Sequence, residues 1–264
     1  MKEEALKTIL DRQEPRAHME KDFKETMELL QEVVNYGTNL IPRAFRTSKR
    51  DLAAAVILGG FLKQAITMLD AVEILISQGA VLAAQVPARS LFETSLYIGW
   101  ILNENTDTRA KQYYVWTLRR ARMWANRLIP GTDENKDFQN VLQQFPAPSS
   151  PEMQKEAQAQ VKEIDRLLGK SEYKTINDEF DRLKSVSKKK SYEPPWYQPW
   201  GSNSIGDIAS RLNRSSEYKL FYAQLSEFAH LEAFKKHVRF QGGTLTFEHI
   251  RHLEGIKTLI YNIA

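Results

Sequence analysis

The sequence predicts an all-α protein, a helical bundle of about eight to ten helices with a protruding polar helical hairpin. Apolar residues recur with heptad-like spacing in segment after segment, and Gly and Pro are scarce inside those segments. No run alternates between apolar and polar residues as a half-buried strand would. With 264 residues and 42% apolar content the chain can bury a sizeable core, so we expect a single helical domain over 1–264, with 134–190 as a polar helical insertion.

The elements follow in order from this periodicity and from the polar or Gly- and Pro-rich breaks between apolar segments. Residues 191–203 form the one long irregular stretch, and 241–246 predicts either a loop or a small hairpin. The helix that precedes this loop is expected to be interrupted near Asn213. Helices are expected near 2–13, 17–46, 50–77, 80–104, 107–128, 134–145, 151–168, 171–187, 205–240 and 247–262.

Residues 50–104 are expected to form the heart of the core, because Leu52 to Leu62 and Ala80 to Val86 are apolar almost all round. Gly59 and Gly60 in mid-helix cost about 1 kcal/mol each relative to alanine, which favours a close helix crossing there. Pro87 either kinks the helix at 80–104 or lies in the first turn of a helix that begins there.

The segment 151–190 is polar and carries only a thin apolar stripe, which is typical of a protruding helical hairpin. Its own core would be too small for a separate domain. The stripe consists of Val161, Ile164, Leu167 and Leu168.

Composition excludes several classes of protein. The chain has no cysteine, which excludes disulfides, thiolate metal sites and cysteine nucleophiles and fits a reducing cytoplasm. The N-terminal residues do not have the pattern of a signal peptide. The longest apolar runs are shorter than the roughly 20 residues of a spanning helix, so we expect a cytoplasmic protein without a membrane partner.

Net charge is +4 and the pI is about 9.0, which permits contact with phosphates without requiring it. Basic residues gather in three places, which are either solvated faces or an electrostatic footprint for RNA or another polyanion. The three groups are Arg43, Arg46, Lys49 and Arg50; Arg109, Lys111, Arg119, Arg120, Arg122 and Arg127; and Lys188 to Lys190.

A row of four polar residues near the C-terminus is the strongest indication of a site. Tyr218, Tyr222, Ser226 and His230 are each four residues apart, and each step rotates only about 40° around a helix, so all four share one face. Leu225 lies beside the same sector, which predicts that this face points inward.

A second row, Arg89, Glu93 and Tyr97, has the same spacing inside an otherwise apolar helix. Buried charges are tolerated only when they are paired or functional. Asp70 on the neighbouring helix can reach Arg89, and a network with Lys63 is expected. Two interpretations stay open: a satisfied buried network that fixes helix register, and a functional pocket.

In a functional pocket His230 would be the acid or base, because its unperturbed pKa lies near 6.5. Arg89 would clamp a phosphate or carboxylate, and Glu93 would hold the guanidinium in place. Ser226 is a further catalytic candidate, although two helix positions four apart supply no oxyanion hole for a nucleophile. The substrate-binding candidates are Tyr97, Tyr218, Tyr222, Asp70 and Trp200.

Trp200 ends a stretch dense in aromatics and prolines, 192–201, which follows the lysine run. The segment is either an apolar strap that closes over the bundle, or a lid or stacking platform for a base. His249 and His252 have a spacing that can bind a metal, but catalytic zinc needs three protein ligands. No metal and no cofactor is expected.

The segment Ala88 to Glu93, Trp200 and the Tyr-x3-Tyr-x3-Ser-x3-His row together resemble an uncharacterised family of bacterial all-helical proteins over roughly 30–240. The helical layout more distantly resembles the HEPN superfamily, which implies a metal-independent RNase of a defence or toxin system. HEPN nucleases pair an Arg with a His and have four to six residues between the two, and the match here is Arg12-x5-His18 with Pro15 in between. This departure puts the nuclease activity in doubt.

We therefore expect a HEPN-like protein that binds RNA or a nucleotide, with His230 as acid or base and Arg89 as phosphate clamp. The alternatives are a non-catalytic sensor of a small molecule or anion, and a helical protein-interaction module. A homodimer is left open. The shared site requires Arg89 and His230 on one cavity.

Overall fold

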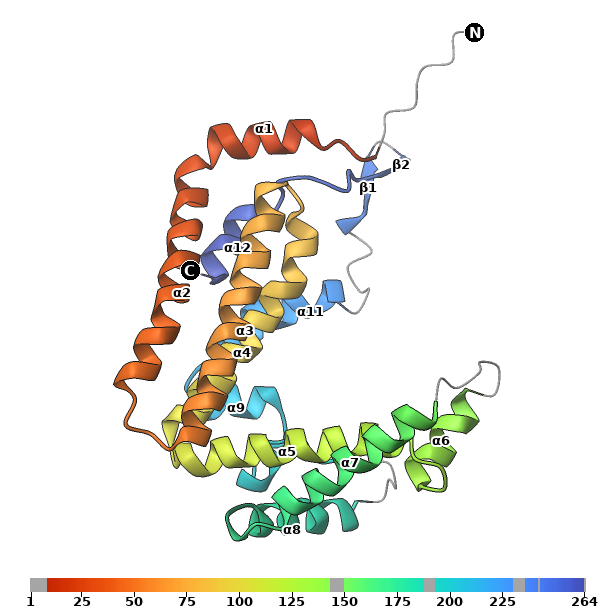
Figure 1. The fold of residues 1–264 in the computed structure, drawn as a ribbon. Coiled ribbons are helices and arrows are strands. Elements are labelled where there is room, and N and C mark those ends of the chain that lie inside the picture. The colour runs from red at the N-terminus through yellow and green to blue at the C-terminus, as the bar shows by residue number, and fades with distance from the viewer. Residues whose placement is uncertain (1–8, 143–149, 188–192, 230–235, 242, 264) are drawn as a thin grey trace. The chain divides into compact units, whose positions relative to one another are not determined.

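The computed structural model describes residues 9–142, 150–187, 193–229, 236–241 and 243–263 (Figure 1). Most of them are helical, which confirms the all-α prediction. The chain divides into two compact units. Unit 1 comprises Met1–Lys49, Leu58–Asn103 and Ile205–Ala264, and unit 2 comprises Arg50–Ile57 and Glu104–Ser204. The prediction of one domain over 1–264 stays a prediction.

Unit 1 packs long helices around one apolar cluster, to which α2, α3, α4, α11 and α12 all contribute. Residues that are almost fully buried there include Val72, Ile76 and Val81. The elements of this unit are α1 (Gln13–Asp22), α2 (Lys24–Thr47), α3 (Leu52–Ser77, which begins in unit 2), α4 (Val81–Asn103), α9 (Ile205–Arg211), α10 (Ser215–Glu217), the π-helix η2 (Tyr218–Tyr222), α11 (Ala223–Ala229), β1 (Val238–Gln241), β2 (Thr244–Phe247) and α12 (Ile256–Ile263).

The single helix predicted at 17–46 is wrong, because two helices occupy this segment. Phe23 separates them with non-helical backbone angles of φ −128° and ψ 17°, and its N–H donates to the Met19 carbonyl as a C-cap. Pro87 lies inside α4, so the helix does not begin there. The helix predicted at 2–13 falls mostly outside the described residues.

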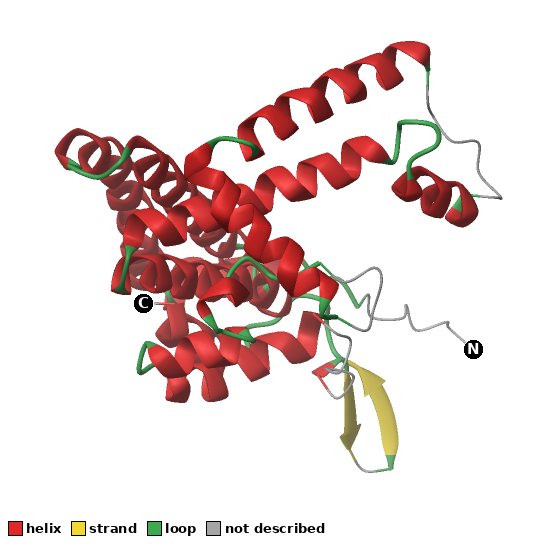
Figure 2. Ribbon diagram, turned by 90° about the horizontal axis from the view of Figure 1, so that it is seen from below, coloured by secondary structure: helices red, strands yellow, loops and turns green. Residues whose placement is uncertain are grey.

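The C-terminal helices were predicted too long. The interruption near Asn213 is confirmed, and this residue adopts φ 60°. Beyond α11 the chain forms an antiparallel hairpin instead of helix, with Val238 paired to Phe247 (Figure 2). Each strand has only four residues, too few for an alternating pattern to stand out, and Gly243 supplies the positive φ of 78° that the turn requires. The hairpin was one of the two interpretations of 241–246.

Helix α3 is less covered than its apolar sequence predicted. Leu52 and Val56 are 75% and 52% exposed, so this run is not enclosed on several sides. By length and composition α3 is also apolar enough to cross a bilayer, with a mean hydropathy of 1.7 in its most apolar window, which corrects the expectation that every apolar run is too short. One such helix is weak evidence, because core helices of soluble proteins meet the same criterion.

The close approach predicted at Gly59 and Gly60 is present at one of the two glycines. A Cβ on Gly59 would lie 2.3 Å from the Phe45 ring of α2, whereas a Cβ on Gly60 would meet no atom within 4 Å. We expect Gly60→Ala to raise the free energy of unfolding by about 0.5–1 kcal/mol, because alanine loses less backbone entropy in a helix. Gly59→Ala must displace the Phe45 ring and is expected to stabilise less or to destabilise. Urea titrations of both variants measure the difference, and equal gains would contradict the contact.

In unit 2 the described part of the segment 151–190 is a helical hairpin, formed by α7 and α8. Ile164 and Leu168 of the predicted stripe are buried together with Tyr173, Phe180 and Val115 of α5. Helix α7 has a regular N-cap, because the Ser150 hydroxyl accepts a hydrogen bond from the Met153 N–H. The elements of this unit are α5 (Thr106–Asn126), α6 (Asp133–Val141), α7 (Pro151–Leu168), α8 (Ser171–Ser185) and the 3₁₀-helix η1 (Gln198–Trp200).

Several basic residues of α5 are committed to ion pairs within unit 2. Arg109 is 2% exposed and donates to Glu104, and Arg119 is 5% exposed and donates to Glu193 and Asp181. Neither interpretation of this basic group, a solvated face or a polyanion footprint, fits these two buried guanidinium groups. In the sequence these arginines show only as basic residues that recur along one helix. Such a pattern does not reveal whether another segment buries their side chains.

The aromatic and proline-rich stretch closes over unit 2 as an apolar strap. Trp196 is 3% exposed and meets the Tyr113 ring edge-on, with centroids 5.4 Å apart. Glu193 at its start accepts from Arg119 and also pairs with Lys184 at 3.3 Å. These contacts favour the structural interpretation over a lid. The lysine run 188–190 lies outside the described residues.

Candidate functional site

Arg89, Glu93 and Tyr222 form one hydrogen-bonded cluster between α4 and the π-helix η2. Arg89 Nε donates to Glu93 Oε1 at 3.0 Å, and its Nη2 donates to the Tyr222 hydroxyl at 2.8 Å. The hydroxyl in turn donates to the same Glu93 oxygen at 2.9 Å. The predicted pairing of Arg89 with Glu93 is confirmed. Both side chains are about one-quarter exposed or less, so the ion pair is partly shielded from water.

The two tyrosines of the polar row stack on each other within η2. Their ring centroids are 4.8 Å apart with planes 17° from parallel, and the Arg89 guanidinium lies 4.8 Å from the Tyr222 centroid. The Ser226 hydroxyl donates to the Tyr222 backbone carbonyl four residues earlier at 2.7 Å, as serine side chains often do inside a helix. π-Helical turns recur at functional sites, because they displace side chains from the regular helical positions.

Other predicted site residues are placed elsewhere or are not described. Tyr97 is half-buried, and its ring lies 6.0 Å from that of Phe61. Asp70 and Lys63 are exposed on α3, so the predicted network of these two with Arg89 is not an internal one. His230 and the side chain of Trp200 lie outside the described residues. The requirement that Arg89 and His230 share a cavity therefore stays a prediction.

Burial raises the pKa of the Tyr222 phenol, and the Glu93 carboxylate raises it further, against the opposing effect of Arg89. An unfolded tyrosine ionises near pH 10. The folded state keeps the proton longer, so the contribution of Tyr222 to stability is present below about pH 10 and is lost as pH rises through the folded pKa.

We therefore expect the free energy of unfolding to fall more steeply between about pH 9 and pH 11 in the wild type than in Tyr222→Phe. Guanidinium titrations at successive pH values measure this slope. Tyr261→Phe is the control, because that side chain is 81% exposed. Equal slopes in the wild type and Tyr222→Phe would contradict the shift.

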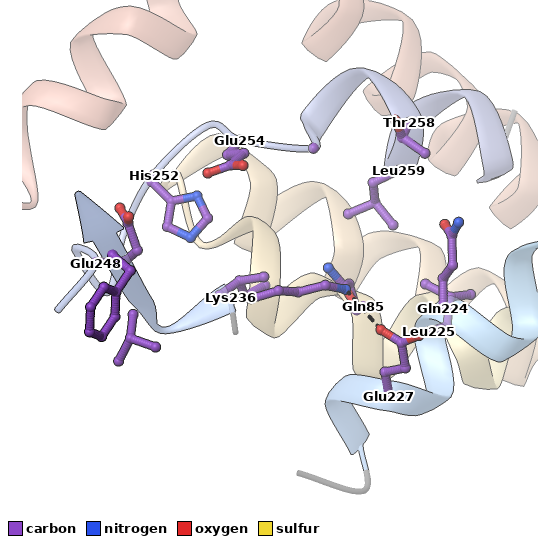
Figure 3. Close-up of a pocket in the computed structure, with 14 residues that line it drawn as sticks. Gln85, Gln224, Leu225, Glu227, Lys236, Glu248, His252, Glu254, Thr258 and Leu259 are labelled. Carbon is purple, nitrogen blue, oxygen red and sulfur yellow. Dashed lines mark ion pairs between the residues drawn. The ribbon is translucent and has the colours of Figure 1, made fainter. Parts of the chain in front are cut away.

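A cavity in unit 1 has a volume of about 660 Å³ (Figure 3). Residues of α4, α11, the β1–β2 hairpin and the segment leading into α12 surround it. They are Leu82, Gln85, Gln224, Leu225, Glu227, Lys236, Val238, Phe240, Glu248, His252, Glu254, Gly255, Thr258 and Leu259. Its size is that of a small-molecule site.

Acidic side chains outnumber basic ones in this cavity. The lining carries Glu227, Glu248 and Glu254 but one lysine, Lys236, which pairs with Glu227 at 3.7 Å. In the view of Figure 3, His252 lies between these two carboxylates. The backbone N–H of His252 donates to the Gly79 carbonyl at 3.0 Å, which fixes this wall to the α3–α4 turn.

The Arg89 cluster lies next to the cavity along the same pair of helices. Gln85 is one turn before Arg89 on α4, and Gln224 follows Tyr222 by two residues. The cluster thus fixes the alignment of α4 against α11 that brings both amide side chains to the cavity. The Oε1 atom of Gln85 is buried and has no hydrogen-bond partner among the described residues, which marks this amide as an unsatisfied polar group in the cavity wall.

Sequence reasoning missed this cavity, because the residues of one wall were assigned to continuous helices. His252 was considered only as part of a metal pair with His249. Among the described residues no group of three or more His, Asp or Glu side chains is placed to hold a metal ion. Arg12 and His18, the one match to the HEPN motif, are both exposed at α1.

Comparison with known proteins finds a family without an assigned activity. No curated protein and no solved structure matches the chain significantly. A family model described as a family of unknown function (DUF5677) matches residues 55–244. This range includes the Arg89 cluster, and it ends inside the β1–β2 hairpin. The chain therefore belongs to DUF5677, an uncharacterised family, as its residue pattern predicted.

Proposed function

We propose that this protein is a non-catalytic sensor that binds a small organic cation in the cavity of unit 1. The observation that carries the proposal is the charge of the lining, where three glutamates accompany a single lysine. A negative cavity attracts cations and raises their local concentration. The anion sensor expected as an alternative is disfavoured by the same excess of carboxylates.

The remaining walls suit an amine with an apolar body. Leu82, Leu225, Val238, Phe240 and Leu259 line the cavity with hydrocarbon and one aromatic ring. An ammonium group can donate to the carboxylates of the lining, while its apolar part packs against these side chains. An aromatic face also attracts a cation directly.

Binding is tested with three probes that share a phenyl ring and are similar in size but differ in charge: benzylamine, benzyl alcohol and benzoate. A ligand of this size binds with a Kd of about 1 mM when its groups are well placed. We expect benzylamine to bind in ligand-observed NMR and the other two to bind at least fivefold more weakly. The proposal is wrong if benzoate binds as tightly as benzylamine, or if none of the three binds.

Glu248→Gln locates the site. Removing one charge a few ångströms from an ammonium group in a water-exposed cavity costs about 1 kcal/mol, which corresponds to roughly fivefold weaker binding. Glu25→Gln is the matched control, because Glu25 is an exposed residue of α2 in the same unit and does not line the cavity. Equal losses in both variants would place the binding elsewhere.

RNA binding is the second candidate, and one face of α5 favours it. Arg120 lies over the Trp116 ring at 5.3 Å and Arg127 over the Trp124 ring at 3.9 Å, so cations and aromatic rings alternate along the helix. Trp124 is 53% exposed. Nucleobases stack on aromatic rings and guanidinium groups of this kind without sequence preference.

Fluorescence anisotropy with a single-stranded RNA tests this candidate. We expect Trp124→Ala to weaken binding by about 1–3 kcal/mol, and Leu102→Ala, another exposed apolar residue, to leave it unchanged. Expression of wild type and His230→Ala in matched cells tests the RNase prediction. Discrete RNA cleavage that the variant loses would support catalysis, and intact RNA with both proteins folded would contradict it.

A further inference from the structure

Helix α2 presents a row of apolar side chains to solvent. Leu29, Val33 and Tyr36 are 55%, 43% and 60% exposed, and the half-buried Leu40 continues the row. Their spacing of four, three and four residues is that of a coiled-coil seam. A different side of the helix is already covered, since Met27 and Leu30 are buried in the core of unit 1. The exposed row is therefore additional to the face that holds α2 in place.

The net charge of α2 changes sign along its length. The N-terminal half holds Glu25, Glu28 and Glu32 against one cation, Lys24, which pairs with Glu28 at 3.7 Å. The C-terminal half holds Arg43 and Arg46. All of these side chains are exposed. An identical helix in antiparallel orientation would set the acidic half of one copy against the basic half of the other. A parallel copy would set like charges together.

We propose that α2 is a self-association surface on which a second copy of this chain binds through its own α2, antiparallel and related by a two-fold axis. The partner is a second copy because the charge pattern of α2 complements itself. Such a pairing is isologous and closes as a dimer without growing into a filament. The apolar seam supplies the affinity, and the charges select the orientation. The proposal is independent of the cavity.

The seam is short, which sets the expected strength. From Leu29 to Leu40 it spans about 16 Å of helix. A contact of this length buries less than the roughly 1,200 Å² of a stable complex, so the dimer is expected to form reversibly with rising concentration. High salt weakens the selection between orientations, because the charges are exposed.

Sedimentation equilibrium of the full chain at low salt tests the proposal by charge exchange. One variant combines Glu28→Arg with Glu32→Arg, and the other combines Arg43→Glu with Arg46→Glu. We expect each variant alone to be monomeric, because its two α2 helices repel, and an equimolar mixture of the two to recover the wild-type dimer. Circular dichroism checks that both variants remain folded.

Tyr36→Glu is expected to abolish the dimer, because it places a charge in the middle of the seam. Three results would overturn the proposal: a wild type that stays monomeric at several hundred micromolar, a dimer that persists in Tyr36→Glu, and a mixture of the two folded charge variants that stays monomeric.

Discussion

Trp100→Ala is expected to lower the free energy of unfolding of unit 1 by about 3–5 kcal/mol. Trp100 on α4 is 1% exposed and is among the largest side chains that are fully buried. Alanine would remove most of its contacts and leave a cavity that the neighbouring helices can fill only in part. The Arg211 guanidinium, which lies 5.8 Å from the ring centroid, would lose its cation–π contact as well.

Urea denaturation followed by far-UV circular dichroism measures this loss. Tyr261→Ala is the control, since this aromatic residue of the same unit is 81% exposed and its removal is expected to change stability by about 0.5 kcal/mol or less. A loss below about 1 kcal/mol for Trp100→Ala would mean that α4 is not at the centre of the core.

Arg119→Met is expected to destabilise unit 2 by about 3 kcal/mol. Burial by itself lowers the pKa of this guanidinium, but the hydrogen bonds that it donates to Glu193 and Asp181 outweigh burial and raise the pKa above its ordinary value. The partners lie 2.7 Å away in both cases, and Asn177 Oδ1 accepts at 2.8 Å. Methionine retains much of the side-chain volume but removes the positive charge. The Glu193 carboxylate, which is 18% exposed, then loses an ion pair that offsets the cost of its burial.

The neighbouring arginine is a matched control for this prediction. Arg120 is exposed and contacts the Trp116 ring, so Arg120→Met is expected to cost about 0.5–1 kcal/mol. Hydrogen exchange of the α5, α7 and α8 amides separates unit 2 from unit 1. Similar losses for both variants would show that the Arg119 ion pairs contribute no more than a surface contact.

Part of the site was predictable because a helix places residues four apart on one face. This rule brought Arg89 to Glu93 and Tyr218 to Tyr222, and the contacts confirm both pairs. It did not reveal that Tyr222 joins the first pair, since that contact spans 133 residues of sequence. Asp70 was placed beside Arg89 because it is acidic and shares a helix sector with Lys63. Its exposure on α3 shows that a shared sector does not determine which neighbour a helix faces.

Helix bounds were predictable where a helix is long enough for its apolar periodicity to repeat over several turns. The segment 151–168 matches α7 at both ends, because Ser150 and Pro151 mark the start and Gly169 follows the last apolar residue. The prediction of one helix over 205–240 was wrong. A left-handed residue, a π-helical turn and a four-residue strand each interrupt the helical periodicity there, and each is shorter than two helical turns.

By itself the sequence determined the helical class, the long helices, the pairs within a helix and the family pattern, because all of these depend on residues close together in the chain. Only the tertiary structure decided that Arg109 and Arg119 are buried and that the hairpin and α12 complete a cavity over Gln85. Burial and cavity walls depend on which distant segments come together. That choice is made by packing and desolvation across the whole core, which no local pattern records.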